Sequence, residues 1–302
     1  MGRTGRADSL RAMHQAFDAG INFFDVARSY GGGEAETVLG EFIRDRRNNV
    51  VICTKFGILP VQRSGWKAAL LPVARKAVQA FPALRKPARK AAGTQFVAGQ
   101  FSIGVLRSSL ETSLRKLHVD AVDILLLHAA PPSAIQQDDL LAELEKMRAE
   151  GKIKVAGISG PGETLRAYAQ SPPSVLTHGQ FACNVFDPAL MQIASAFDPS
   201  RISLVANHAF GGPHGVAETQ RRIEALRERA DVSSELKAKL IAGGPLLMPE
   251  IILRALTQSG AIASVIVSMM SPSNLRSNLH AIEADRFTEN EISLLGAALG
   301  LH

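Results

Sequence analysis

The chain has 302 residues, of which 46% are hydrophobic and 21% charged, as expected for a folded globular protein with a sizeable core. No apolar run approaches the roughly 20 residues of a membrane span and no signal-peptide core begins the chain, so we expect a cytoplasmic protein without a membrane partner. Its two cysteines, Cys53 and Cys183, have no metal-ligand spacing, which argues against a disulfide framework and against a metal site.

The net charge of +6 arises in one stretch of the chain. From Arg46 to Ser109 the sequence holds 12 of the 34 Lys and Arg residues and none of the 28 acidic residues, so the remainder is net acidic. A solvated surface is the usual reason for such a run, and attraction of an anionic ligand is the alternative. Aromatic residues are not interleaved with these cations as in nucleic-acid platforms, so we expect no nucleic-acid partner.

The chain is predicted to open on a helix. Its apolar residues Leu10, Met13 and Phe17 follow spacings of three and four. Either residue of the Asp8–Ser9 pair can supply the N-cap, and Gly20 can end the helix.

An apolar run from Ile21 to Val26 predicts a buried strand that delivers Asp25 to its carboxyl end, and Tyr30 follows in a glycine-rich turn. The glycines at 31–33 lack the spacing of a dinucleotide-binding fingerprint, so we interpret them as part of the turn. Apolar residues between Val38 and Ile43 predict the next helix.

Two later strands have the same design. Val50–Thr54 ends on Lys55, and Val122–Leu127 ends on His128. Alternating strands and helices predict a parallel sheet, in which the carboxyl ends of all strands lie on one face and carry the active site. Four ionisable side chains are therefore expected to meet there: Asp25, Tyr30, Lys55 and His128.

The rest of the chain continues this alternation after a long basic insertion at about 58–100. Ser102 is predicted to cap the helix before the His128 strand, and Thr288 and Glu291 are predicted to form a capping box at the last helix. Further strands are expected at Ile153–Ile158, Leu176–Ala182, Leu204–Ala206 and Ala263–Val267. Together these elements predict an α/β fold with seven barrel-type strands.

These contexts resemble the aldo-keto reductase family in the segments GINFFDVARSYGGGEAETVLG, VVICTKFG, SLETSLRKLHVDAVDILLLH and LEKMRAEGKIKVAGIS. The resemblance covers nearly the whole chain and implies a (β/α)8 TIM-type barrel as a single domain over residues 1–302. It also implies an NAD(P)H-dependent oxidoreductase that reduces a carbonyl of a small-molecule substrate to an alcohol, with NADPH expected and NADH as the alternative.

The N-terminus departs from the family pattern. In the family a strand and a glycine-containing loop precede the first helix, whereas only Met1–Ala7 precedes it here. We therefore expect either an open barrel or a reading frame that starts upstream of Met1.

In the family the four ionisable residues form a catalytic tetrad, and each residue type suits carbonyl reduction. A tyrosine with a pKa of about 10 is a poor acid unless a cation stabilises its phenolate, and Lys55 beside Tyr30 would supply that cation. Asp25 would pair with Lys55, and His128 would hydrogen-bond the carbonyl oxygen and orient the substrate. Taken singly, each of these strand-end residues is more often a cap, a surface cation or a packing residue.

The expected nicotinamide contacts differ in part from the family pattern. Ser159 and Gln180 match the residues that hold the nicotinamide amide, while Gly160 stands where asparagine is usual. The aromatic residue that stacks on the nicotinamide has no tyrosine or tryptophan counterpart here, and His208 or Phe210 is the nearest substitute.

The segment VIVSMMSPSNLRSNLHAIE resembles the part of the family that holds the adenosine phosphate at a helix N-terminus. By register Ser271, Asn274 and Asn278 match cofactor-binding positions, with Asn278 as the expected adenine-binding residue. Ser268 takes the place of a basic residue in many NADP-specific members, and Arg276 is the nearest cation.

A second hypothesis is a non-catalytic scaffold or cofactor sensor on the same barrel. An N-terminally truncated product is one form of this alternative. The altered nicotinamide contacts and the missing first strand favour this alternative. The intact set of Asp25, Tyr30, Lys55 and His128 favours the reductase.

Overall fold

The structure is a computed structural model that describes residues 5–60, 96–269 and 271–301. Most of the basic insertion predicted at 58–100 lies outside these residues. At its two ends, β3 (Leu59–Pro60) and β4 (Phe96–Val97) form a short antiparallel pair.

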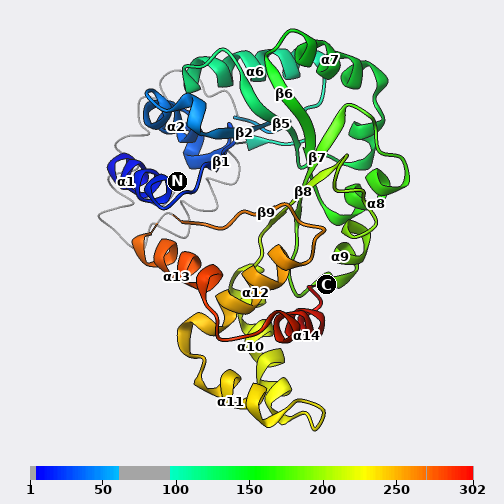
Figure 1. Cartoon of the computed structure of the whole chain (residues 1–302). Helices are drawn as coiled ribbons and strands as arrows, with labels where there is room; N and C mark the ends of the chain where they lie inside the picture. Colours follow the sequence, from blue (N-terminus) through cyan, green and yellow to red (C-terminus); the bar gives the residue numbers. More distant parts are fainter. Residues whose placement is uncertain (1–4, 61–95, 270, 302) are drawn as a thin grey trace, which may run out of the picture.

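Seven parallel strands form one curled sheet in the order β1-β2-β5-β6-β7-β8-β9 (Figure 1). The strands are β1 (Phe23–Asp25), β2 (Val51–Phe56), β5 (Val122–His128), β6 (Ile153–Ser159), β7 (Leu176–Ala182), β8 (Ser203–Asn207) and β9 (Ser264–Val265). Each of them overlaps a strand predicted from the sequence. The curled parallel sheet with helices along its outside confirms the predicted α/β barrel class.

The helices follow the strands along the chain, and α2, α6, α7 and α8 cover the outside of the curled sheet in Figure 1. The α-helices are α1 (Arg6–Asp18), α2 (Ala35–Ile43), α6 (Ile103–Leu117), α7 (Asp138–Ala149), α8 (Gly162–Gln170), α9 (Pro188–Ala194), α10 (Gly212–Glu228), α11 (Ser234–Ala242), α12 (Leu247–Gln258), α13 (Pro272–Glu283) and α14 (Glu289–Leu299). The short 3-10 helices are η1 (Tyr30–Gly33), η2 (Arg47–Asn49), η4 (Pro132–Gln136) and η5 (Gly244–Leu246).

Within the part of the chain that the structure describes, no single helix has the length and apolar character needed to cross a membrane. By length and composition alone, α11 and the helical segment Gly244–Gln258 meet that requirement together, and they are bent by 106° to each other.

Three of the four helix ends predicted above are confirmed. The Ser102 hydroxyl accepts a hydrogen bond from the backbone of the first turn of α6. Thr288 and Glu291 form the predicted capping box at α14, and Gly20 has a φ of 87° just beyond α1.

The predicted N-cap of α1 is wrong. The helix begins at Arg6 with Gly5 as its N-cap, so Asp8 and Ser9 lie in its first turn. Gly5 takes the extended conformation that an N-cap needs, and the Asp8 carboxylate near the helix N-terminus complements the helix dipole.

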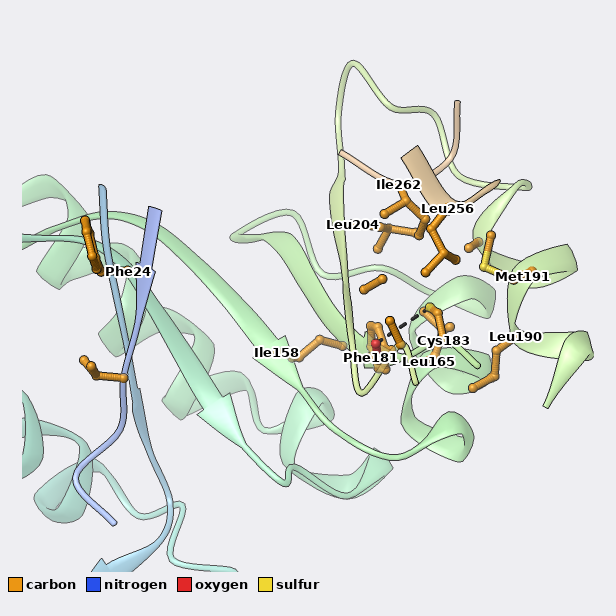
Figure 2. Packing of buried hydrophobic residues seen from close by; sticks show 14 of the residues in the cluster. Phe24, Ile158, Leu165, Phe181, Cys183, Leu190, Met191, Leu204, Leu256 and Ile262 are labelled. Atoms are coloured by element: carbon orange, nitrogen blue, oxygen red, sulfur yellow. Dashed lines mark hydrogen bonds between the residues drawn. The ribbon is translucent and has the colours of Figure 1, made fainter. Parts of the chain in front are cut away.

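The two faces of the sheet bury different side chains. The outer face packs against the helices in the main core, where Figure 2 shows Phe181 and Leu204 of the sheet beside Leu165 of α8 and Leu256 of α12. The inner face holds a small apolar cluster, made of Cys53, Ile124, Leu126, Phe23, Val51 and Val155. Because side chains of a strand alternate between faces, the inward rows of β1, β2 and β5 continue from this cluster to their carboxyl ends.

The sheet is open between its first and last strands. Among the described residues, β1 pairs with β2 alone and β9 pairs with β8 alone. A cavity of about 190 Å³ lies between the two edges, lined by Phe23 and Phe24 of β1, Val265 of β9 and Met13 of α1. We call this opening between β1 and β9 the seam.

Candidate active site

Three strand ends and one turn bring the four predicted ionisable side chains together. The Lys55 ammonium donates a hydrogen bond to Asp25 and another, of 3.3 Å, to the backbone carbonyl of Val26. The same ammonium lies 5.1 Å from the centre of the Tyr30 ring. The His128 imidazole packs edge-on against that ring, with the two ring centres 5.7 Å apart.

Strand periodicity explains why these groups converge. Asp25, Lys55 and His128 each lie two residues beyond a member of the inner apolar cluster, so each extends the inward row of its strand. Lys55 is almost fully buried at 1% exposure, whereas Tyr30 is 37% exposed on the η1 turn. The four ionisable residues therefore combine a buried charged group, Lys55, with a partly exposed phenol, Tyr30.

Asp25 keeps Lys55 charged. Burial is the largest single effect and acts to lower the pKa of Lys55, but Asp25, Cys53 and Tyr30 together outweigh it, so the pKa of Lys55 is raised. Burial and the Lys55 charge together lower the pKa of His128 to about 4, so its imidazole is neutral at neutral pH. A neutral imidazole can still donate one hydrogen bond.

Burial raises the pKa of Tyr30 above its ordinary value. Lys55 acts to lower this pKa, which is the predicted effect, but burial outweighs it and Asp25 also opposes it. Lys55 thus favours the phenolate as predicted, and burial sets the net direction in the protein alone. Because the phenol keeps its proton at neutral pH, Tyr30 can serve as a proton donor.

Gln180 links the tetrad to Ser159. Its side-chain nitrogen donates to Asp25 at 3.1 Å, and its side-chain oxygen accepts from the Ser159 hydroxyl at 3.0 Å. The strand register places Ser159 between His128 on β5 and Gln180 on β7. Each end of the Gln180 carboxamide keeps capacity for one further hydrogen bond.

A cavity of about 610 Å³ opens beside Asp25, Tyr30 and Gln180. Its other wall comes from residues 207–212, which begin at the last residue of β8, and from residues 266–269, which follow β9. Both predicted stacking residues, His208 and Phe210, lie in this wall. The volume falls in the range of small-molecule and cofactor sites.

The other predicted cofactor residues lie on and before α13. The Ser271 hydroxyl is the N-cap of this helix and accepts from the Asn274 backbone at 3.1 Å. Asn278 is buried at 5% exposure one turn later, and Arg276 is exposed. In the sequence, the cavity-wall residues Ser268 and Met269 come shortly before Ser271, the N-cap of this helix.

Sterics explain the glycine at position 160. A Cβ atom built there would lie 2.8 Å from the Ala130 carbonyl oxygen and 3.2 Å from the Thr164 Cβ. Any side chain would force its neighbours to move, so the local packing excludes an asparagine at this position. Ser159 and Gln180 are then the remaining predicted amide-binding pair.

Sequence reasoning missed His178. This residue is 3% exposed and its ring stacks on Phe23 across the interior, with the ring centres 6.5 Å apart. Its Nε2 has no hydrogen-bond partner among the described residues, and burial lowers its pKa to about 4. The sequence feature that could have identified His178 is its position two residues before Gln180, which places both side chains on the inward face of β7.

The chain matches the family model for the aldo/keto reductase family over residues 1–299. It is 24% identical over 303 residues to the uncharacterized oxidoreductase YqkF of Bacillus subtilis, covering 97% of this chain and 88% of that protein. It is 24% identical over 299 residues to L-galactose dehydrogenase of Arabidopsis thaliana, covering 93% and 80% respectively.

Among solved structures, the holo form of aldo-keto reductase AKR11C1 from Bacillus halodurans aligns with a TM-score of 0.70 and 18% identity. That alignment covers 98% of this chain and 88% of the other. At this identity the likeness establishes the fold, in agreement with the barrel described above.

Proposed function

Because this chain belongs to the aldo-keto reductase family, whose members are generally oxidoreductases, we propose that it reduces an aldehyde or ketone to an alcohol with Tyr30 as proton donor. One observation carries this proposal. The buried Lys55 ammonium, bonded to Asp25, lies against the Tyr30 ring beside a neutral His128.

Tyr30 would move the proton. As negative charge develops on the carbonyl oxygen, the phenol gives its proton to that oxygen, and the Lys55 charge stabilises the phenolate left behind. Asp25 holds the ammonium in position and keeps it charged. His128 is suited to donate a hydrogen bond to the same carbonyl oxygen and to orient the substrate.

The residues around the large cavity fit a nicotinamide cofactor. Ser159 and Gln180 would hold its carboxamide, because both are polar, neighbouring and next to the tetrad. The N-terminus of α13, with Ser271 and Asn274, would hold phosphate oxygens. When bound, the reduced nicotinamide supplies the hydride that the carbonyl carbon receives.

We propose NADPH as the preferred cofactor, with NADH as the alternative. Arg276 on α13 is exposed and forms no ion pair with any other described residue, so it is free to meet the additional phosphate of NADPH. Ser268, in the cavity wall, offers a hydroxyl but no charge.

A cofactor sensor or scaffold is the second candidate function. It is favoured by Gly160, where a side chain does not fit. It is also favoured by the cavity wall opposite Tyr30, made of residues 207–212 and 266–269, whose only aromatic candidates for stacking are His208 and Phe210. Weak nicotinamide contacts would leave the adenosine end as the main source of affinity.

Calorimetric titration with NADPH and with NADH, followed by an absorbance assay of NADPH consumption with a panel of aldehydes, separates the two functions. Binding with turnover supports the reductase. Binding without turnover of any aldehyde or ketone supports the sensor, and absence of binding by either nucleotide contradicts both.

A further inference from the structure

The turn that carries Tyr30 has little intrinsic rigidity. Gly31, Gly32 and Gly33 follow the tyrosine, with φ values of 63°, 69° and 94°. Consecutive glycines allow many backbone conformations, so the sequence of this turn does not itself hold the phenol in one place. Besides the hydrogen bonds within η1, backbone hydrogen bonds run from Tyr30 to the Ala27 carbonyl at 3.0 Å and from Glu34 to the Tyr30 carbonyl.

Helix α6 holds this turn on both sides of Tyr30. The Lys116 ammonium donates to the Gly33 carbonyl at 2.7 Å, three residues after the tyrosine. The Arg28 guanidinium donates to the buried Ser109 hydroxyl at 2.9 Å, two residues before it. Ser109 and Lys116 are seven residues apart, which is about two turns, so they lie on one side of the helix.

The two held points form the base of the loop. A Cβ atom built on Gly33 would lie 3.8 Å from the Arg28 carbonyl oxygen, so the backbone at Gly33 lies close to the backbone at Arg28. The segment between them forms a loop that carries Tyr30. Fixing Arg28 and Gly33 therefore fixes the base from which the phenol projects.

Helix α6 is a firm support for these contacts. A Cβ atom on Gly40 of α2 would lie 2.5 Å from the Lys116 carbonyl oxygen and 2.8 Å from the Leu117 Cα, so the backbones of α2 and α6 are in direct contact. The apolar side of α6, including Leu106 and Leu110, is buried in the main core.

We propose that Arg28 and Lys116 are positioning residues, through which α6 fixes the Tyr30 turn for proton transfer. They do not contact reacting atoms, and their effect passes through the backbone on either side of the tyrosine. The inference rests on the proposed function of Tyr30. Displacing the phenol by about 1 Å can lower the reaction rate by as much as about a hundredfold.

The test compares Lys116→Met with Lys116→Arg, and with Arg107→Met as a matched control. Arg107 lies on the same helix and pairs with Glu143, away from the turn. Lys116→Met should lower kcat about ten- to a hundredfold and leave the Kd for NADPH within about twofold, because only the phenol position changes. Lys116→Arg should recover most of the lost rate, and Arg107→Met should match the wild type.

Hydrogen exchange provides a readout that does not need activity. In the protein without ligands, the amides at 31–34 should exchange faster in Lys116→Met than in the wild type, and Ser109→Ala should have the same effect from the other side of the turn. Arg107→Met should leave their exchange unchanged.

Two results would overturn the proposal. One is wild-type kcat and wild-type exchange at 31–34 in both Lys116→Met and Ser109→Ala. The other is an equal loss of kcat in Arg107→Met, which would mean general destabilisation of α6. If the wild type reduces no carbonyl substrate, the proposed function fails, while the exchange measurement still decides whether α6 holds the turn.

Discussion

Lys55 and Asp25 set the electrostatics of the candidate site. The side chain of Lys55 is 0% exposed and that of Asp25 is 10% exposed, so the buried ammonium depends on the carboxylate beside it. The pair places the Lys55 charge under the Tyr30 ring. Burial and the Lys55 charge lower the pKa of His128, while Asp25 acts in the opposite direction. The site thus places the charged Lys55 beside two neutral groups, Tyr30 and His128, that can donate a hydrogen bond.

Two histidines, the partly buried His128 and the buried His178, should make the stability of the protein depend on pH. His128 and His178 each have a pKa of about 4 in the folded protein, below the ordinary 6.5. Between these values the unfolded chain binds more protons than the folded one, so stability is fully present above about pH 6.5 and falls as the pH drops toward 4. The loss should be on the order of 2 kcal/mol per histidine.

Urea unfolding across this pH range measures the effect. His178→Phe keeps an aromatic ring next to Phe23 and removes one of the two titrating groups. It should therefore reduce the change in the free energy of unfolding over this pH range by about half. An unchanged slope in the variant would contradict a neutral His178 in the folded state.

At the scale of elements, the close contact of α2 and α6 should be sensitive to a single methyl group. Gly40→Ala would put a Cβ atom 2.5 Å from the Lys116 carbonyl oxygen, and backbone cannot move aside as a side chain can. We expect a loss of about 1–3 kcal/mol in the free energy of unfolding.

Gly104→Ala is the matched control for this substitution. Gly104 is also helical, in α6, but a Cβ atom there meets nothing within 4 Å. This variant should be neutral or more stable by up to about 1 kcal/mol in urea unfolding. Equal stability of the two variants would contradict the close packing of α2 on α6.

The strands and their polar ends were predictable because local signals determine them. Apolar runs that end on Asp25, Lys55 and His128 define both the strand and the residue at its carboxyl end, and parallel topology then brings the ends together. Most caps were equally local. The N-cap of α1 was not, because Gly5 and Asp8 both suit a helix N-terminus and the helix takes the earlier start.

The net pKa of Tyr30 and the role of α6 could not be read from the sequence. The first depends on how much of the ring is buried, which outweighs the charge of Lys55. The second depends on contacts between Lys116 and Gly33, which are 83 residues apart in the chain. Such effects follow from packing and not from a local pattern.

At the scale of the whole molecule, the large cavity spans the two ends of the open sheet. Asp25 and Val26 line it from the side of β1, and residues 266–269 line it from the side of β9. These two edges do not pair with each other among the described strands. A ligand in the cavity therefore contacts both sides of the seam.

Cofactor binding should for this reason stabilise the seam as well as the fold. NADPH at about a hundred times its Kd should add about 2.7 kcal/mol to the free energy of unfolding. Hydrogen exchange should slow in β1 and in residues 264–269 more than in β5 and β6, which are paired on both sides. Uniform slowing over all strands would contradict a ligand that bridges the seam.

The central claim is that Tyr30 gives the proton in carbonyl reduction, and Tyr30→Phe tests it most directly, because the variant loses one hydroxyl and keeps the ring against Lys55 and His128. The measurement is kcat for an aldehyde together with the calorimetric Kd for NADPH, in the variant and the wild type. We predict a fall in kcat of about a hundred- to ten-thousandfold with a Kd within about twofold. Turnover by Tyr30→Phe at the wild-type rate would contradict the account.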